Sequence, residues 1–225
     1  MTAVARHLPR TSELNVLDLG CGVGRFSPLL ADAFGGTVFA VDPSRQMLAE
    51  AERNNAHPSV QYMRGAAEAI PAADGSIDFA FLSMMIHHVG NQQRCAEELR
   101  RVLKPNGRVF VRNSFSGRLD SVAFYAWFPE ARAIDEARLP RIEAVCQSFQ
   151  QAGFSIVAIE SIEQQIDTSL EVHFQRLQKR AISTFEFLTD EQIEAGFARM
   201  RPAVDAEDVP QPVMETIDLI VLCKP

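Results

Sequence analysis

Short apolar runs alternate with amphipathic patterns along the first half of the chain. Short apolar runs bounded by turn residues are typical of buried strands, whereas apolar positions spaced three and four residues apart are typical of helices. The apolar runs fall at about 15–20, 37–42, 60–63, 77–82 and 108–111. Helical patterns lie between them, so the sequence predicts a parallel sheet with right-handed crossovers.

Several predicted helices carry recognisable end signals. A helix over about 24–34 is expected to stop at the Gly35 and Gly36 pair, because glycine is typical of a helix C-terminus. Ser44 is expected to cap the next helix, since a serine hydroxyl can accept from a free backbone amide there. The helix before the fifth strand is expected to close at 104–107, which reads Lys-Pro-Asn-Gly.

The second half of the chain has a different pattern. Residues 114–139 contain the single Trp and four other aromatic residues, without a strand pattern. Beyond them the sequence predicts, in order, a helix, a strand, two helices and a final strand. These fall at about 140–152, 154–162, 169–184, 189–201 and 215–224. We therefore expect one domain over 1–225, with 114–139 and 163–210 inserted on the sheet as helical lid segments that contact the substrate.

Composition limits the classes of function. The chain has 225 residues, of which 47% are hydrophobic, and this suits one α/β domain with an elaboration. A net charge of −7 disfavours a large nucleic-acid footprint, which needs a basic face. The four cysteines are scattered, and neither a signal-peptide core nor an apolar stretch of about 20 residues is present. We expect a cytoplasmic protein without a membrane partner.

The most informative stretch is 16–42, VLDLGCGVGRFSPLLADAFGGTVFAVD. An apolar run meets three alternating glycines, and the next apolar run ends in Asp42. Glycines let the backbone approach a ligand closely, and an acid that ends the second strand can accept hydrogen bonds from a ribose diol. A dinucleotide fingerprint reads G-x-G-x-x-G, but the position three after Gly22 is Arg25. The spacing D-x-G-x-G-x-G favours a different cofactor.

That spacing resembles the class I S-adenosylmethionine-dependent methyltransferases. Later segments resemble them in the same order: AVDPSRQML, YMRGAAEAIPAADGSIDFAF, SMMIHHV and ELRRVLKPNGRVFV. The resemblance covers roughly 14–160 and is closest to the ubiquinone and menaquinone biosynthesis group. It implies a Rossmann-like, doubly wound, mostly parallel seven-stranded sheet, with order 3-2-1-4-5-7-6 and an antiparallel last strand. It also implies S-adenosylmethionine as cofactor and S-adenosylhomocysteine as product.

The resemblance assigns a set of cofactor contacts along the carboxyl edge of the sheet. Amides of Gly20 and Gly22 are expected against the methionine portion, and Asp42 against both ribose hydroxyls. Asp18 is expected near the cofactor's amino group, or alternatively as a strand-end acid that ties down the loop amides. The full set is Asp18, Gly20, Cys21, Gly22, Gly24, Asp42, Pro43, Met47, Ala66, Ala67, Glu68 and Ser83.

One position departs from the family pattern. Ala66 stands where the family usually has an Asp that accepts from the adenine amine. The adenine edge must then be read from elsewhere, or by backbone and apolar packing alone. Such a loss is worth on the order of 1 kcal/mol, so we expect weakened binding rather than none. Met47 and Ile70 are candidates to sandwich the adenine, and equally candidates for the core.

Candidate substrate-side residues follow the fourth and fifth strands. His87 or His88 could take a hydroxyl proton, but helix-start and packing roles are the more common use of such residues. Arg112 and Asn113 end a strand where the transferred methyl is expected, and Arg112 equally suits a surface ion pair. No metal site is expected.

The aromatic residues of the second half have two interpretations. Phe124, Trp127 and Phe128 recur at helical spacing, with Tyr125 alongside, which indicates one face of a short helix. Such a stripe is more often core than pocket, yet Tyr125 and Trp127 are candidates for substrate contact. His173 has no partner that the sequence identifies, and Arg176, Lys179 and Arg180 form a small basic face.

The sequence thus predicts an enzyme that transfers a methyl group to oxygen, nitrogen or carbon of a small molecule, as a monomer or homodimer. Such enzymes work largely by positioning and exclusion of water, so no catalytic triad is needed. One alternative is a methyltransferase acting on tRNA or other nucleic acid, although SMMI stands where N/D-P-P-Y/F would be expected. The other is a cofactor-binding protein without transferase activity, which Ala66 favours.

Overall fold

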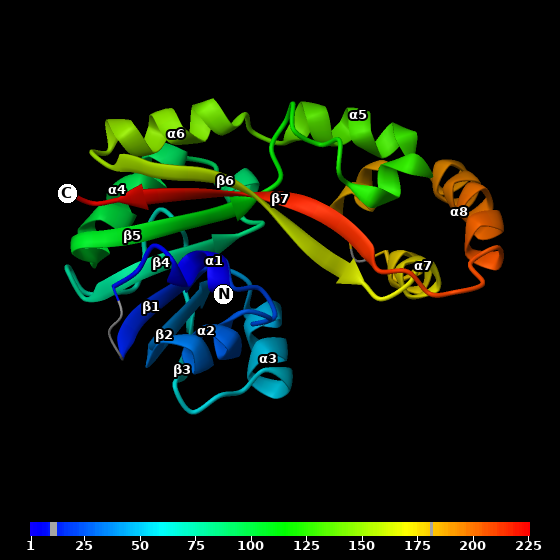
Figure 1. The fold of residues 1–225 in the computed structure, drawn as a ribbon. Helices are drawn as coiled ribbons and strands as arrows, with labels where there is room; N and C mark the ends of the chain where they lie inside the picture. Colours follow the sequence, from blue (N-terminus) through cyan, green and yellow to red (C-terminus); the bar gives the residue numbers. More distant parts are fainter. Residues whose placement is uncertain (10–12, 181) are drawn as a thin grey trace. The chain divides into compact units, whose positions relative to one another are not determined.

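The computed structural model describes residues 1–9, 13–180 and 182–225 and contains a seven-stranded sheet (Figure 1). Its order is β3-β2-β1-β4-β5-β7-β6, as the resemblance implied. Strands β1 to β5 pair in parallel, and β7 runs antiparallel to β5, with Arg108 opposite Cys223 and Asn113 opposite Asp218. The predicted fold is therefore confirmed, including the reversed strand.

The strands and helices have the following bounds. The strands are β1 Leu14–Leu19, β2 Gly35–Asp42, β3 Val60–Arg64, β4 Ile77–Ser83, β5 Leu103–Asn113, β6 Ser155–Asp167 and β7 Val213–Cys223. The α-helices are α1 Thr2–Ala5, α2 Ser27–Phe34, α3 Arg45–Asn54, α4 Gln92–Val102, α5 Pro129–Arg138, α6 Ile142–Gln151, α7 Leu170–Gln178 and α8 Asp190–Asp205. Short 3-10 helices are η1 Ile86–His88, η2 Ala123–Ala126 and η3 Ser183–Phe187. Within the described ranges, no helix is both long and apolar enough to cross a membrane.

The chain divides into two compact units. Unit 1 comprises Met1–Asn113, Ile142–Glu160 and Asp218–Pro225, and unit 2 comprises Ser114–Arg141 and Ser161–Ile217. Strands β6 and β7 each belong partly to both units. The predicted insertions, 114–139 and 163–210, fall almost entirely within unit 2. Their role as a lid stays a prediction.

The core of unit 1 lies along the central strands of the sheet. Leu17, Phe79 and Phe110 are fully buried, as expected for parallel strands with helices on both faces. Figure 1 shows α4 and α6 together on one face of the sheet and α2 and α3 on the other. This arrangement leaves the carboxyl ends of β1 and β2 free to form a site.

The loop between β1 and α2 explains where the first long helix begins. Gly20, Gly22 and Gly24 have φ values of 72°, 56° and 77°, a region that side chains rarely adopt. Because Gly24 cannot be helical in this conformation, α2 begins at Ser27 and not near residue 24. A Cβ on Gly24 would also overlap the Tyr62 hydroxyl. Glycine is therefore required there by both conformation and space.

Two of the predicted helix ends are confirmed. Gly35 follows α2 in the left-handed conformation with φ of 74°, and the Ser44 side chain accepts from Met47 N at the start of α3. Two other ends differ from the prediction. The helix before the fifth strand, α4, already stops at Val102, and 104–107 lie within β5. Helix α7 stops at Gln178, followed by Arg180 at φ 50°, so the expected helix over 169–184 is too long.

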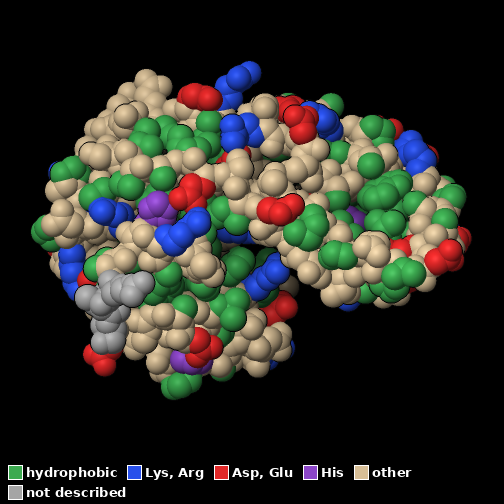
Figure 2. All heavy atoms as spheres, in the orientation of Figure 1, with side chains coloured by type: hydrophobic (Ala, Val, Ile, Leu, Met, Phe, Trp, Pro, Cys, Tyr) green, Lys and Arg blue, Asp and Glu red, His purple; other side chains and the backbone are tan. Residues whose placement is uncertain are grey.

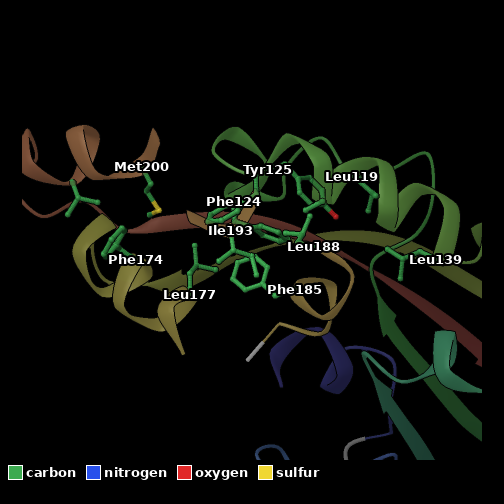
Figure 3. Close-up of a cluster of buried hydrophobic side chains, with 13 residues drawn as sticks. Leu119, Phe124, Tyr125, Leu139, Phe174, Leu177, Phe185, Leu188, Ile193 and Met200 are labelled. Carbon is green, nitrogen blue, oxygen red and sulfur yellow. The ribbon is translucent and has the colours of Figure 1, made fainter. Parts of the chain in front are cut away.

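Unit 2 has its own aromatic core. Figure 3 shows this cluster of buried side chains, which come from η2, α7, η3, α8 and the segments between them. Its members include Leu119, Phe124, Tyr125, Phe128, Phe174, Leu177, Phe185, Ile193 and Met200. The aromatic stripe is thus core, although the single short helix expected for it is wrong. The chain forms η2 and then starts α5 at Pro129, because proline suits the first turn of a new helix.

Gly196 tests the packing of this core. Alanine in place of a helical glycine normally stabilises a protein by about 1 kcal/mol. Here a Cβ at residue 196 would overlap the Phe128 ring. We expect Gly196→Ala to lower the free energy of unfolding by about 1–3 kcal/mol in chemical denaturation, because the core is overpacked. Adding Phe128→Leu should recover part of the loss. An increase in stability for Gly196→Ala alone would contradict this packing.

Candidate functional site

A cavity of about 540 Å³ lies in unit 1 at the carboxyl ends of β1, β2 and β4. This volume and position are typical of ligand sites in open α/β sheets. Nine of its lining residues were predicted from the sequence: Gly20, Gly22, Asp42, Pro43, Met47, Ala66, Ala67, Glu68 and His88. Seven were not: Leu19, Val41, Ser44, Gly65, Met84, Met85 and Val89. Most of the missed residues are next to predicted ones in the sequence. Position beside a predicted residue is therefore the sequence signal that could have identified them.

Asp42 holds the floor of this cavity together. Its Oδ2 accepts from Gly22 N at 3.0 Å, and its Oδ1 accepts from Ser44 N at 2.8 Å. The side chain is buried but lines the cavity. A carboxylate has about four acceptor positions, so two internal bonds leave capacity for a ligand's hydroxyls. Asp42 is therefore both a structural tie and an available acceptor.

The backbone amides of the three loop glycines donate hydrogen bonds within the protein. Gly20 N donates to Val41 O at 2.8 Å, and Gly24 N donates to Cys21 O at 2.9 Å. With Gly22 N bound to Asp42, all three glycine amides are engaged within the protein. Gly20 and Gly22 line the cavity, and the expected contact of their amides with the methionine portion of a ligand stays a prediction. These bonds shape the loop, and a Cβ on Gly22 would meet nothing within 4 Å, so this glycine faces open space.

Asp18 lies below the loop and is absent from the cavity lining. It is almost fully buried, and the Ser27 hydroxyl donates to its Oδ2 at 2.6 Å. The pKa of Asp18 is raised to about 7, mainly by burial and to a smaller extent by the charge of Asp42, although the hydrogen bond from Ser27 opposes the rise. The carboxyl therefore changes its charge near neutral pH. It braces the start of α2 and stays a predicted cofactor residue.

The lining is apolar and acidic. Met47, Met84 and Met85 supply flexible apolar surface, and Met47 and Met84 are more than 40% exposed. Asp42 and Glu68 supply carboxylates, and no Lys or Arg is among the described lining residues. Such a lining favours a ligand that carries positive charge and apolar surface. A pyrophosphate, in contrast, would have no cation to neutralise it here.

The segment after β3 forms one wall of the cavity. Gly65 N donates to Asp42 O at 3.2 Å, which places this wall directly beside the acid. Ala66 and Ala67 line the cavity without polar side chains, and Glu68 Oε1 accepts from Asn91 N at 3.2 Å. Ile70 is buried and is not among the lining residues, so of the two residues considered for an adenine sandwich only Met47 lies at the cavity.

The two neighbouring histidines lie in different surroundings. His88 lines the cavity, whereas His87 Nδ1 is 3.0 Å from Asn113 Oδ1. Their ring centroids are 4.0 Å apart. Asn113 is fully buried, so its side chain positions His87 rather than facing the cavity. Of the two predicted bases, only His88 is at the cavity wall.

Ser83 and Arg112 are paired across β4 and β5. Arg112 Nη1 donates to Ser83 Oγ at 2.9 Å, and the guanidinium lies 5.4 Å from the centre of the Phe26 ring. Neither residue lines the cavity, and the same holds for Cys21 and Gly24. Burial raises the pKa of Cys21, so this side chain is a neutral thiol at physiological pH. These four residues are therefore outside the cavity lining, and their roles as ligand contacts stay predictions.

The expected aromatic contacts belong to unit 2. Tyr125 is buried and donates to Asp135 Oδ2 at 2.7 Å, and burial, followed by this bond, raises the pKa of Tyr125. Trp127 packs against the same core. His173, for which the sequence identified no partner, has Nδ1 at 2.6 Å from Asp167 Oδ2. Neither Tyr125 nor Trp127 is among the lining residues of the cavity in unit 1.

Asp18 gives the site a measurable pH dependence. Because its pKa is about 7 in the folded protein and about 3.8 ordinarily, the folded state holds the proton between these values while the unfolded state releases it. Stability from this group is complete below pH 4 and is lost as the pH rises toward 7. We expect the free energy of unfolding of wild type to fall relative to Asp18→Asn by up to about 4 kcal/mol across this window.

Asparagine keeps an acceptor for the Ser27 hydroxyl, so the comparison isolates the ionisation. Urea denaturation of both proteins at several pH values between 4 and 8 measures it. Parallel stability curves for the two proteins would contradict the assignment of a raised pKa to Asp18.

Comparisons with known proteins agree with this geometry. Residues 17–111 match the methyltransferase domain family. The chain is 35% identical to the malonyl-[acyl-carrier protein] O-methyltransferase of Erwinia pyrifoliae, over 67% of this chain and 58% of that protein. It is 29% identical to the biotin biosynthesis bifunctional protein BioHC of Cellvibrio japonicus, over 93% of this chain and 42% of that protein. The chain thus spans about half the length of these curated relatives.

A solved structure has the same fold over nearly the whole chain. It is that of a proposed methyltransferase from an antibiotic biosynthesis pathway of Anabaena variabilis, with a TM-score of 0.80 and 20% identity. The match covers 98% of this chain and 94% of that one. Together with the glycine loop and the acid after β2, these matches show that the chain belongs to the class I methyltransferases, whose cofactor is S-adenosylmethionine.

Proposed function

We propose that this protein transfers the methyl group of S-adenosylmethionine to a heteroatom of a small-molecule acceptor. The observation that carries the proposal is the cavity in which Asp42 lies beside the glycine loop and in which no Lys or Arg is found among the described lining residues. A sulfonium cation suits such a lining, and the Asp42 carboxylate suits a ribose diol. The apolar methionine side chains suit the faces of a purine.

The protein contributes to the reaction mainly by positioning the cofactor and the acceptor. The bound cofactor supplies a methyl group on a sulfonium, which a nucleophile can take by in-line displacement with S-adenosylhomocysteine leaving. Unit 1 would hold the ribose at Asp42 and exclude water with Met84 and Met85. Because the leaving group is already activated, orientation supplies much of the rate.

The need for a base depends on the acceptor. A hydroxyl must lose its proton, and His88 is the predicted histidine that lines the cavity. A carboxylate needs no base. The relatives named as malonyl-[acyl-carrier protein] O-methyltransferases favour an acidic acceptor, which we propose here as the first class to test. Unit 2, which contains the two predicted insertions, is the proposed source of acceptor contacts.

A nucleic-acid acceptor has less support. In the face that Figure 2 shows, Lys and Arg side chains are scattered among Asp and Glu. Arg176 and Arg180, two of the three residues of the small basic face, are engaged with Asp167 and Asp190. A nucleic-acid footprint needs unpaired basic charge along one face.

Transfer of label tests the proposed function. Methyl-labelled S-adenosylmethionine is incubated with the protein and, separately, with malonyl-acyl carrier protein, malonyl-coenzyme A, a demethylated quinone or bulk tRNA. We expect label in a small or carrier-bound acceptor and none in tRNA. Label in tRNA alone would contradict the substrate class. Binding of cofactor without transfer to any of a broad metabolite pool would favour the binding-protein alternative.

Asp42 provides the corresponding test of the site. We expect Asp42→Ala to weaken S-adenosylhomocysteine binding by roughly 10- to 100-fold in titration calorimetry, because hydrogen bonds to a charged group are lost and the loop is released. Asp32→Ala is a matched control, since Asp32 is an exposed acid of α2 outside the cavity. Unchanged affinity for Asp42→Ala would contradict the proposed site.

A further inference from the structure

The cavity raises a question of selectivity at its far wall. If the proposed cofactor site is correct, the ribose lies at Asp42 and the purine lies beyond it, against the wall that Gly65 N fixes beside Asp42. This inference therefore rests on the proposed function. An adenine edge carries a 6-amino group, which donates hydrogen bonds. A site that selects adenine must place an acceptor opposite this group.

The wall offers few acceptors. Gly65, Ala66 and Ala67 have no polar side-chain atoms. In the proposed site the remaining acceptor capacity of Asp42 is used by the ribose, and the Ser44 hydroxyl accepts from Met47 N at 3.3 Å. Glu68 is thus the one side chain among wall residues 65–68 that can accept a hydrogen bond.

Glu68 is held in a defined position with one oxygen still available. Its Oε1 accepts from the amide of Asn91, the residue that caps α4. The positive end of the α4 dipole stabilises a carboxylate there. Among the described residues, none donates a hydrogen bond to Oε2. The side chain is half-buried and lines the cavity.

We propose that Glu68 selects adenine by accepting a hydrogen bond from its 6-amino group through Oε2. Ala66 cannot make this bond, because its side chain is a methyl group. Oε1, which accepts from the Asn91 amide, fixes the position of the carboxylate, and Oε2 accepts the hydrogen bond from the adenine. Glu68 is therefore a specificity-determining residue, and the purine specificity of the site depends on the start of α4.

The test compares two ligands that differ at the 6-position of the purine and, as a consequence, at N1, which is an acceptor in adenine and carries a proton in hypoxanthine. S-inosylhomocysteine has a 6-oxo acceptor where S-adenosylhomocysteine has the 6-amino donor. We expect wild type to bind the adenine ligand at least about tenfold more tightly in titration calorimetry, because a carbonyl opposite a carboxylate is left unpaired. Glu68→Gln keeps the size and an oxygen for Asn91, and its amide can donate to the 6-oxo group. This variant should reduce or reverse the preference.

Two further variants separate recognition from folding. Glu97 is an acid of α4, and Glu97→Gln makes the same chemical change there. This control variant should leave the preference for adenine unchanged. Ala66→Asp added to Glu68→Ala should restore a preference for adenine, since the acid returns to the same wall. If Glu68→Gln loses affinity for both ligands equally, the proposal is overturned. It is also overturned if this variant keeps the affinities and the preference of wild type. Failure of wild type to bind either ligand would instead contradict the cofactor site.

Discussion

The site depends on the two internal hydrogen bonds of Asp42. One carboxylate joins the end of β2 to Gly22 of the loop after β1 and to Ser44 at the start of α3. Its backbone carbonyl also accepts from Gly65 after β3. Three segments that are far apart in sequence therefore meet at one residue. Because a carboxylate can accept further bonds, the group that assembles the cavity is also the one available to a ligand.

The charged side chains of the two units differ in their hydrogen-bond partners. In unit 1, carboxylates at the cavity keep acceptor capacity, and their neighbours are apolar. In unit 2, two buried carboxylates are bonded internally: Asp135 accepts from Tyr125 and Thr184, and Asp167 bonds to His173 and Arg176. The buried Nε2 of His173 has no hydrogen-bond partner among the described residues. The pairing of the two carboxylates is what burial of polar groups requires. The polar features of unit 2 that stand out in the sequence are therefore largely structural.

The strand positions and the glycine loop could be predicted because they depend on local signals, whereas the sheet order and the cavity-lining residues followed from the resemblance to the methyltransferase family. Apolar periodicity located the strands, and glycine spacing located the loop. Hydrogen-bond partners could not be predicted, because they depend on contacts across the chain. The Gly20 amide is taken by Val41, and the Tyr125 hydroxyl by Asp135. No sequence pattern distinguishes a tyrosine that faces a substrate from one that faces a buried acid.

The proposed function requires that this cavity binds S-adenosylmethionine with its ribose at Asp42. A crystal structure of the protein with S-adenosylhomocysteine is the most direct test. We expect both ribose hydroxyls within hydrogen-bonding distance of the Asp42 carboxylate, the homocysteine along the glycine loop and the purine against the wall that ends at Glu68. A ligand seated elsewhere in the protein, or a ribose turned away from Asp42, would contradict it.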